Sequence, residues 1–297
     1  GRWIMTTSTN NIVTMPSTPN FSDSTWSLVR TVGVTVSPFT GQKKTQEFGY
    51  NYFAGDLTLP SLSRTQASQW QSFLANCQGQ INSFQLGDPD AKTNQGTYGQ
   101  THLTASRRVD DSSETLSFSG ATITAGTSIF GSLIAGDFVH VTGATNEANN
   151  GTHKVSSVTN ASTIITTTTL TTESNTAGCK IRQNVSGATG IALTTVSSDT
   201  GTILAGDYLG VLSGNSLSHQ PFQLLLVTED AVRSGTSVAV KTEPRLRKDL
   251  TDGYFVTFQN PKGLFRLQSN EINWSADRAS TYGISFSVIE DVSASNT

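Results

Sequence analysis

The sequence of 297 residues has few charged residues, few cysteines and no long apolar run. Only 14% of the residues are charged and the formal net charge is -3, which argues against electrostatic capture of nucleic acid or of an anionic membrane by the whole surface. No apolar run approaches the roughly 20 residues of a membrane-spanning helix, and no basic start leads into a signal-peptide core. We therefore expect a soluble protein with no membrane partner.

The sequence also lacks the usual marks of a metal, cofactor or nucleophile site. Cys77 and Cys179 are far apart, which favours reduced, buried thiols over a disulfide framework and leaves a single inter-domain bridge as the alternative. No Gly-x-Ser-x-Gly elbow, phosphate loop or dinucleotide glycine motif is present. The histidines are scattered, with no partner at a metal-ligand spacing: His102, His140, His153 and His219. We expect no catalytic residue, no metal and no cofactor, and hence no enzyme.

Neighbouring acidic residues are the remaining candidates for catalysis, because a glycosidase needs only two carboxyl groups at the right distance. The candidate pairs are Asp88 with Asp90, Asp110 with Asp111, and Glu290 with Asp291. The first pair flanks a proline, where aspartate commonly bonds its own backbone, and the second lies at an expected domain boundary. A structural role is favoured, with a polysaccharide hydrolase kept as a minor alternative.

The clearest element is one amphipathic helix. Ala67, Trp70, Phe73, Leu74 and Cys77 recur at spacings of three and four residues, which predicts a helix over 65–77 with one apolar face. Ser63 or Thr65 can cap its start, and Gly79 supplies a left-handed stop. No second convincing helix is found, so this helix should cover a sheet.

Alternating apolar residues predict strands on both sides of this helix and again at the end of the chain. Val32, Val34 and Val36 alternate like a half-buried strand, and further strands are expected around 26–28, 48–52, 57–59, 81–86, 254–258, 264–267 and 282–288. A terminal hairpin alone would have little to pack on, so we expect the front and rear strands to form one discontinuous domain. Its expected core is Leu57, Leu59, Trp70, Phe73, Leu74, Phe84, Leu86, Ile284 and Phe286.

The middle of the chain contains an internal repeat. The segment 134–141 (Ile-Ala-Gly-Asp-Phe-Val-His-Val) matches the segment 204–211 (Leu-Ala-Gly-Asp-Tyr-Leu-Gly-Val), which starts 70 residues later. In each copy a Gly-Asp turn precedes an aromatic-led strand, so Asp137 and Asp207 are interpreted as turn formers. The repeat continues with 152–158 matching 222–227 and 163–166 matching 237–240. We interpret the two copies as related β modules in tandem.

The fold class predicted is mainly β: an antiparallel β-sandwich or barrel hub domain with one packed α-helix, plus inserted small β-barrel or sandwich modules. The expected boundaries are an N-terminal extension at 1–14, the first part of the hub at 15–108, an inserted module at 109–184, a second module at 185–259, the C-terminal hub strands at 260–291 and a tail at 292–297.

Two further groups of residues have alternative interpretations. Phe138 and Tyr208, which open the repeated strands, could stack on sugar rings, although an aromatic residue in this position is more often core. The basic clusters Arg107-Arg108 and 245–248 (Arg-Leu-Arg-Lys) lack interleaved aromatic residues, so solvated or inter-subunit salt-bridging strand ends are favoured over nucleic-acid binding.

An ordered set of short motifs resembles a known family. The motifs are Ser-Pro-Phe-Thr-Gly-Gln at 37–42, Leu-Thr-Leu-Pro at 57–60, Arg-Thr-Gln-Ala at 64–67 followed by Trp70 and Phe73-Leu74, Phe-Gln-Leu-Gly-Asp-Pro at 84–89, Leu-Ala-Gly-Asp-Tyr at 204–208, Asn-Pro-Lys-Gly-Leu-Phe-Arg-Leu at 260–267, and 274–286. Together they cover about two thirds of the chain and resemble the distal tail proteins of long-tailed (siphovirus-like) phages and gene-transfer particles. The stretch 110–182 departs from the shorter members of that family.

The resemblance implies a structural part of a virion. It implies a homohexameric ring at the tail tip that joins the tail tube protein to hub and fibre-bearing proteins, with DNA only passing through the channel. It implies assembly in the host cytoplasm and no catalytic residues to carry over. The alternative is a carbohydrate-binding or host-surface adhesion module of the tail, based on Phe138 and Tyr208.

Overall fold

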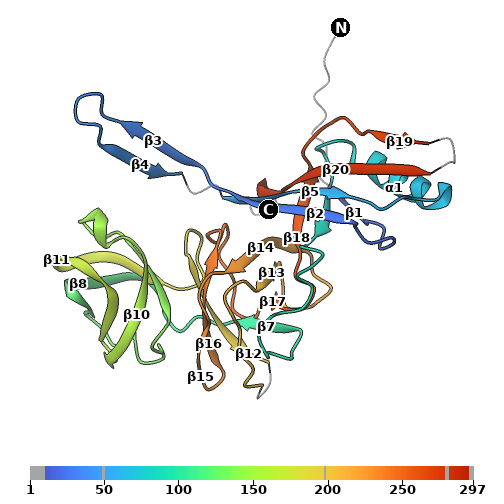
Figure 1. Cartoon of the computed structure of the whole chain (residues 1–297). Helices are drawn as coiled ribbons and strands as arrows, with labels where there is room; N and C mark the ends of the chain where they lie inside the picture. Colours follow the sequence, from blue (N-terminus) through green and yellow to red (C-terminus); the bar gives the residue numbers. More distant parts are fainter. Residues whose placement is uncertain (1–10, 49–50, 197–198, 278–280, 294–297) are drawn as a thin grey trace, which may run out of the picture. The chain divides into compact units, whose positions relative to one another are not determined.

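The computed structural model describes residues 11–48, 51–196, 199–277 and 281–293 (Figure 1). They form two compact units: unit 1 combines the residues up to Lys92 with those from Lys262 onwards, and unit 2 is the continuous segment Thr93–Pro261. Strands dominate both units and one α-helix is described, which confirms a mainly β fold with one packed helix. Most of the expected extension 1–14 and tail 292–297 lies outside the described residues, as does part of the strand expected at 48–52.

The main sheet of unit 1 takes strands from both ends of the chain. β20 pairs with β5, with Val288 opposite Gly55, and β18 pairs with β6, with Phe265 opposite Phe84. The β1–β6 pair is parallel and the others are antiparallel. Along the sheet the strands are β1 (Ile12–Val13), β6 (Ser83–Leu86), β18 (Gly263–Leu267), β20 (Tyr282–Glu290), β5 (Tyr52–Thr58) and β2 (Asp23–Val29), with β19 (Trp274–Ala276) also pairing with β20. Front and rear strands therefore share one sheet, which is the arrangement that the strand pattern predicts.

Helix α1 (Arg64–Cys77) begins and ends at caps that the sequence encodes. Ser63 and Gln66 form a capping box: the Ser63 hydroxyl accepts from the Gln66 backbone N–H at 3.4 Å, and the Gln66 side-chain oxygen accepts from the Ser63 backbone N–H at 3.0 Å. At the other end Gln78 is already left-handed, with φ of 51°, and Gly79 follows with φ of 65°. The left-handed stop thus begins one residue earlier than the expected Gly79.

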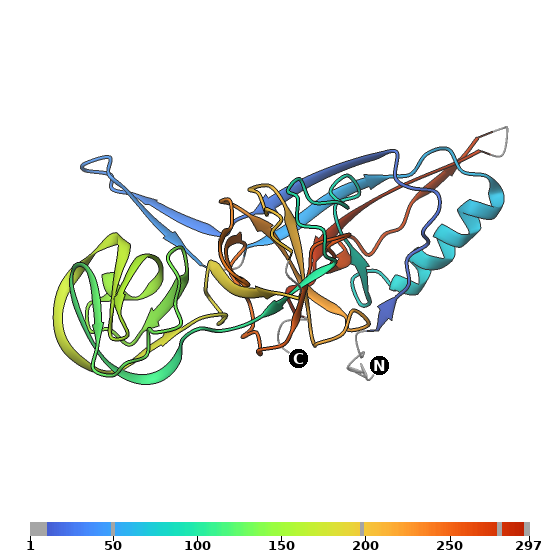
Figure 2. The ribbon, with the colours of Figure 1, turned by 90° about the horizontal axis from the view of Figure 1, so that it is seen from below.

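Helix α1 lies beside the sheet of unit 1 in Figure 2, and its buried apolar face contacts that sheet through aromatic rings. Trp70 lies 6.1 Å from Phe286 of β20 between ring centroids, and Phe73 meets Phe84 of β6 edge-on at 5.1 Å. Phe286 is partly exposed, in contrast to the expectation that it is core, because one of its ring neighbours, Phe21, is itself partly exposed. The other expected core residues are buried: Leu57, Leu59, Trp70, Phe73, Leu74, Phe84, Leu86 and Ile284.

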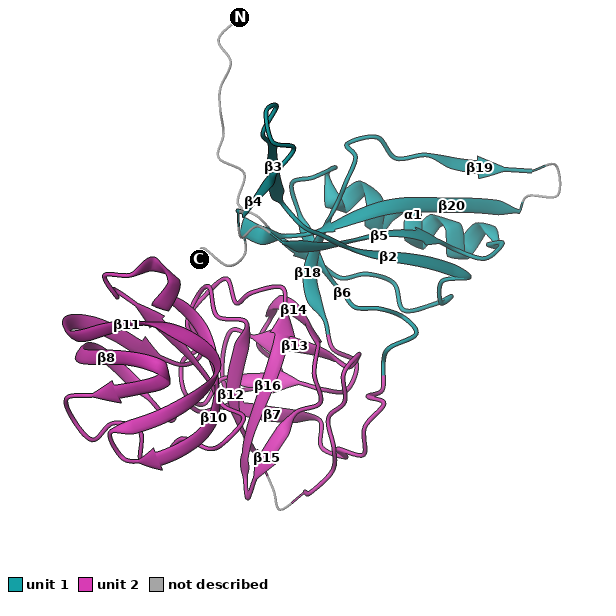
Figure 3. Cartoon of the chain, turned by 60° about the vertical axis from the view of Figure 1, so that its left-hand side comes forward, with its two compact units in different colours: residues 1–92, 262–295, 297 teal, residues 93–261, 296 magenta. Residues whose placement is uncertain are grey.

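Unit 2, magenta in Figure 3, contains a closed six-stranded antiparallel barrel. The barrel closes where β16 pairs with β12, and an apolar core including Leu103, Leu209 and Val256 fills it. The strands in order round the barrel are β12 (Gly190–Thr195), β7 (His102–Ala105), β17 (Phe255–Thr257), β13 (Tyr208–Leu212), β14 (Pro221–Val227) and β16 (Ser237–Glu243), and β15 (Val232–Ser234) lies beside β16.

A second β module is inserted between β7 and β12. Its long strands β8 (Asp110–Ala125) and β11 (Thr163–Arg182) pair with each other, and the hairpin of β9 (Phe138–Thr142) and β10 (Gly151–Asn160) closes against both halves of β11. A 3-10 turn, η1 (Glu147–Asn149), joins the hairpin strands. A separate core that includes Leu116, Phe118 and Ile164 fills the module.

The module boundaries in the structure differ from those predicted from the sequence. The segment 93–108 was expected in the hub, but its strand β7 pairs with β12 and β17 of the barrel. The first module is consequently nested inside the second, not in tandem with it. The physical reason is that Leu103 and Ala105 are buried in the barrel core, because their strand β7 is one of the six strands that close the barrel.

The two copies of the repeat have matching turn geometry. Gly136 and Gly206 are left-handed, with φ of 93° and 96°. One carboxylate oxygen of Asp137 accepts from the Ile134 N–H at 2.9 Å, and Asp207 accepts from the Leu204 N–H at the same distance. In both copies the glycine N–H also donates at 2.8 Å to a valine carbonyl on the second strand after the turn, which is Val155 of β10 or Val227 of β14. These bonds confirm that both aspartates form turns.

Candidate assembly surface

The β3–β4 hairpin, formed by β3 (Val32–Val36) and β4 (Lys43–Glu47), is a two-stranded sheet separate from the main sheet of unit 1. Its register places Val36 opposite Lys43 and Val34 opposite Thr45. Figure 1 shows it projecting from one end of unit 1. A two-stranded ribbon alone is marginally stable in water, so this hairpin is suited to gain stability from a partner.

One face of β3 carries three exposed valines, which we call the valine face. Val32, Val34 and Val36 are 45%, 57% and 50% exposed, and they share a face because alternate residues of a strand point the same way. The sequence predicts a half-buried strand here, and that prediction is wrong: β4 is almost entirely polar, so neither strand has a core to cover. Contiguous apolar surface of this kind commonly marks a protein interface.

The loop at the tip of the hairpin is ordered by its own hydrogen bonds. The Ser37 hydroxyl accepts from the backbone N–H groups of Phe39 and Thr40 at 3.4 and 3.3 Å, and the Ser37 N–H donates to the Gln42 carbonyl at 2.9 Å. Gly41 has a φ of 67°, which favours glycine. The loop thereby presents Phe39, which is 95% exposed, to the solvent.

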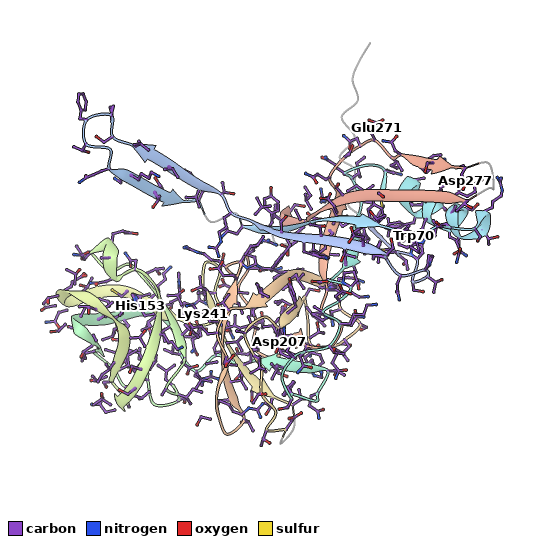
Figure 4. The ribbon with its side chains drawn as sticks, in the orientation of Figure 1. Trp70, His153, Asp207, Lys241, Glu271 and Asp277 are labelled. Atoms are coloured by element: carbon purple, nitrogen blue, oxygen red, sulfur yellow. The ribbon has the colours of Figure 1, made fainter. Side chains whose placement is uncertain are left out.

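A second apolar residue is exposed at β19, the short strand beside β20. Trp274 is 54% exposed although its neighbour across the ladder, Ile284, is buried. Glu271 precedes β19 and Asp277 follows it (Figure 4). The Asp277 carboxylate accepts a hydrogen bond from the Thr281 N–H at 2.7 Å. β3–β4 and β19 lie at opposite ends of unit 1 in both Figure 1 and Figure 2.

The residues considered for sugar contact do not form an open aromatic platform. Phe138 is buried; a Cβ atom on Gly190 would lie 2.1 Å from its ring, and the ammonium of Lys154 lies 5.6 Å from its centroid. The core interpretation therefore holds for Phe138, because the residue is only 7% exposed. Tyr208 is half-buried in β13 of the barrel.

The acidic pairs have structural hydrogen bonds. Asp88 accepts from the Asp90 N–H at 3.0 Å, which is the turn interpretation. Asp110 forms ion pairs with Arg107 and Arg182, and Asp111 accepts from the Ser113 N–H at 2.9 Å. Glu290 accepts from the Phe53 N–H at 3.2 Å, and Asp291 accepts from Ser83 and pairs with Arg266.

The histidines likewise make local contacts. His102 stacks on Phe255 with centroids 3.8 Å apart, and burial lowers its pKa. His140 bonds the Thr152 hydroxyl at 3.0 Å, and His153 bonds the Asn149 carbonyl at 2.9 Å. Across the part of the chain that the structure describes, no three His, Cys, Asp or Glu side chains gather where they could hold a metal ion. Cys77 and Cys179 are free and buried, as predicted.

One arginine of the basic clusters has a role that sequence reasoning missed. Arg108 is buried and forms a bidentate ion pair with buried Asp137 of the nested module, at 2.8 Å from Nε to Oδ2. Its Nη1 donates to the Leu193 carbonyl, and its Nη2, which also pairs with Asp137, donates to the Val238 carbonyl, each at 3.2 Å. Arg108 thus joins the nested module to the barrel. The signal available in the sequence was an arginine next to a module boundary and a duplicated aspartate.

Comparisons with known proteins found no family model that matches this sequence and no curated protein that is similar to it. Among the described helical residues, none forms a stretch long and apolar enough to cross a membrane.

Proposed function

We infer that this chain is a structural component of a phage-like tail tip, forming a ring, hexameric by resemblance, that joins the tail tube to the hub and fibre-bearing proteins. Unit 1 forms the ring in this proposal. Unit 2, with its nested module, is carried by the ring. DNA passes through the channel without being bound in sequence-specific fashion, and the protein acts in the virion after assembly in the host cytoplasm.

The ordered resemblance to distal tail proteins supports this proposal. All of its motifs except the one at 204–208, which lies in unit 2, come from the two ends of the chain that unit 1 combines in one sheet. The motif at 84–89 includes the end of β6, and the motif at 260–267 includes β18, which pairs with β6. The motif at 37–42 is the loop that presents Phe39. The segments 37–42, 84–89 and 260–267 thus belong to the main sheet of unit 1 and its projecting hairpin.

The observation that carries the proposal is the valine face of the β3–β4 hairpin. Three valines at about half exposure and a phenylalanine at 95% exposure stand on a ribbon that has no sheet behind it. Burying such side chains contributes roughly 1.5–3 kcal/mol for each one that becomes fully covered. An assembly of copies supplies that cover, whereas a free monomer leaves it in water.

The alternative, a carbohydrate-binding module, keeps Tyr208 of the aromatic pair on which it was based, whereas Phe138 is buried beside Gly190 and Lys154.

The experiment is to measure the mass of the full chain by native mass spectrometry and light scattering over a range of concentrations, and to image the largest species by negative-stain electron microscopy. We expect a closed ring, with six-fold views. A chain that stays monomeric at every concentration and does not enter particles when co-expressed with tail proteins would overturn the proposal. Val34→Asp should shift the chain to monomer while unit 1 stays folded, with Lys180→Glu on the nested module as a control that leaves assembly unchanged.

A further inference from the structure

We propose that copies of this chain join head to tail, with the β3–β4 hairpin of one copy seated against the β19 edge of the next, where Trp274 is the apolar anchor. This inference rests on the proposed ring and names its contact. The occupant of the valine face is thus a second copy of this chain.

The positions of the two surfaces favour a head-to-tail contact. The β3–β4 hairpin and β19 lie at opposite ends of the same unit, so the two surfaces of one copy cannot contact each other. They can meet only between two copies. A contact between two different patches repeats from copy to copy. It forms a ring when the rotation closes.

The apolar groups on the two surfaces match in kind. The hairpin offers a row of small branched side chains, Val32, Val34 and Val36, with Phe39 at the tip. β19 offers Trp274, a large flat side chain of the type that most often anchors protein interfaces. β19 is also an outer strand that pairs only with β20 among the described strands, so its free edge is open to a neighbouring chain.

The charges of the two surfaces are opposite. The segment 30–48 contains Arg30, Lys43 and Lys44 against the single acid Glu47, so its formal charge is +2. Within the described part of the chain, Lys43 and Lys44 form no ion pair. The segment 270–281 around β19 contains Glu271, Asp277 and Arg278, so its formal charge is -1, and Arg64 donates to the Tyr282 hydroxyl at 3.2 Å. Lys43 lies opposite Val36 and so shares the valine face, where it can meet a carboxylate beside Trp274, which steers association and fixes its direction.

Cross-linking tests the contact directly, because both native thiols are buried and a new surface cysteine is the reactive one. The variant that carries both Gln42→Cys and Asn273→Cys, two exposed positions that leave Phe39 and Trp274 in place, is treated with a bismaleimide. It should give a ladder of covalent multimers up to the size of the ring. Each single variant is the matched control and should give no ladder, because one cysteine per copy cannot link a chain of copies.

Charge reversal tests the same contact by rescue. Lys43→Glu should raise the concentration for half-assembly roughly tenfold or more, because like charges then face each other across the interface, whereas Lys44→Glu on the other face of β4 is the matched control. Adding Glu271→Lys to the Lys43→Glu chain should restore assembly. Far-ultraviolet circular dichroism of each variant shows that it is folded.

The outcomes separate this inference from the proposed function. A wild-type chain that never assembles overturns both. A wild-type ring that forms while the double-cysteine variant gives no ladder, and while Glu271→Lys gives no rescue, overturns the head-to-tail contact and leaves the ring intact. A ladder together with rescue supports both.

Discussion

Replacing Asp137 by asparagine should destabilise unit 2 more than the same change at Asp207, although the two residues occupy matching turns. Both carboxylates accept a backbone N–H at 2.9 Å within the turn. The second partner differs: Asp137 neutralises buried Arg108, whereas Asp207 accepts the Gln95 N–H at 2.6 Å. The side chains of Arg108 and Asp137 are only 6% and 0% exposed.

The magnitude follows from this difference. Asp137→Asn leaves the Arg108 charge buried without a counter-ion, which typically costs about 3–5 kcal/mol. Asp207→Asn loses one hydrogen bond to a charged acceptor, which costs about 1.5–3 kcal/mol. With a urea dependence of about 2 kcal/mol per molar, the midpoints should fall by roughly 2 M and 1 M.

The assay uses the uneven distribution of tryptophan between the two units. All four tryptophans, Trp3, Trp26, Trp70 and Trp274, lie in segments of unit 1, so tryptophan fluorescence follows that unit while circular dichroism follows both. Both variants should lower the urea midpoint for unfolding of unit 2, which circular dichroism detects and tryptophan fluorescence does not. The extra cost of Asp137→Asn should persist in high salt, since a buried pair is weakly screened.

A double-mutant cycle with Arg108→Met checks the cause. If Asp137→Asn costs no more than Asp207→Asn, or if the cycle shows no coupling between Arg108 and Asp137, the ion pair does not join the nested module to the barrel and the reasoning fails.

Three further predictions concern other parts of the chain. Trp70→Ala should destabilise unit 1 by about 3–5 kcal/mol through the cavity it leaves and abolish assembly, whereas Gln69→Ala on the exposed side of α1 should change the urea midpoint of the remaining tryptophan fluorescence little. Desolvation alone would raise the pKa of Glu173, but hydrogen bonds from residues 176, 146, 145 and 149 outweigh it and lower the pKa to about 2. Its contribution to stability is therefore present above the ordinary pKa of 4.5 and lost as the pH falls towards 2; Glu173→Gln should remove this part of the acid dependence of unfolding, and an unchanged profile would contradict it. Burial raises the pKa of Cys77 to about 12, so native protein should leave Cys77 and Cys179 unreactive towards a thiol reagent and denatured protein should react at both, whereas rapid native labelling would refute their burial.

Much of the fold could be predicted from local patterns. The three- and four-residue spacing from Ala67 to Cys77 predicts α1 because its apolar face is continuous and its cap residues are specific. The repeated Gly-Asp turns were recognisable because each copy needs a left-handed glycine and an adjacent aspartate, whose carboxylate accepts the N–H of the residue three positions earlier.

Other features depend on long-range pairing and could not be read locally. Val32, Val34 and Val36 alternate like any half-buried strand, and only their pairing with the polar β4 reveals that nothing covers them. Residues 102–105 look like a hub strand until β12 and β17 pair with them from distant parts of the chain. The buried pair of Arg108 and Asp137 arises because the nested module folds back on its own attachment point.

The way the nested module joins the barrel has a consequence for how such chains can change. Asp110 and Arg182, the first residue of β8 and the last of β11, are direct partners across the ladder. The module thus leaves and re-enters the barrel through two adjacent strands, β7 and β12, which pair directly with each other. Because lengthening a closed loop adds only a slowly growing entropic cost, this attachment point can accept domains of very different size. A domain exchanged at this point must also supply a counter-ion for buried Arg108, because Asp137 belongs to the nested module.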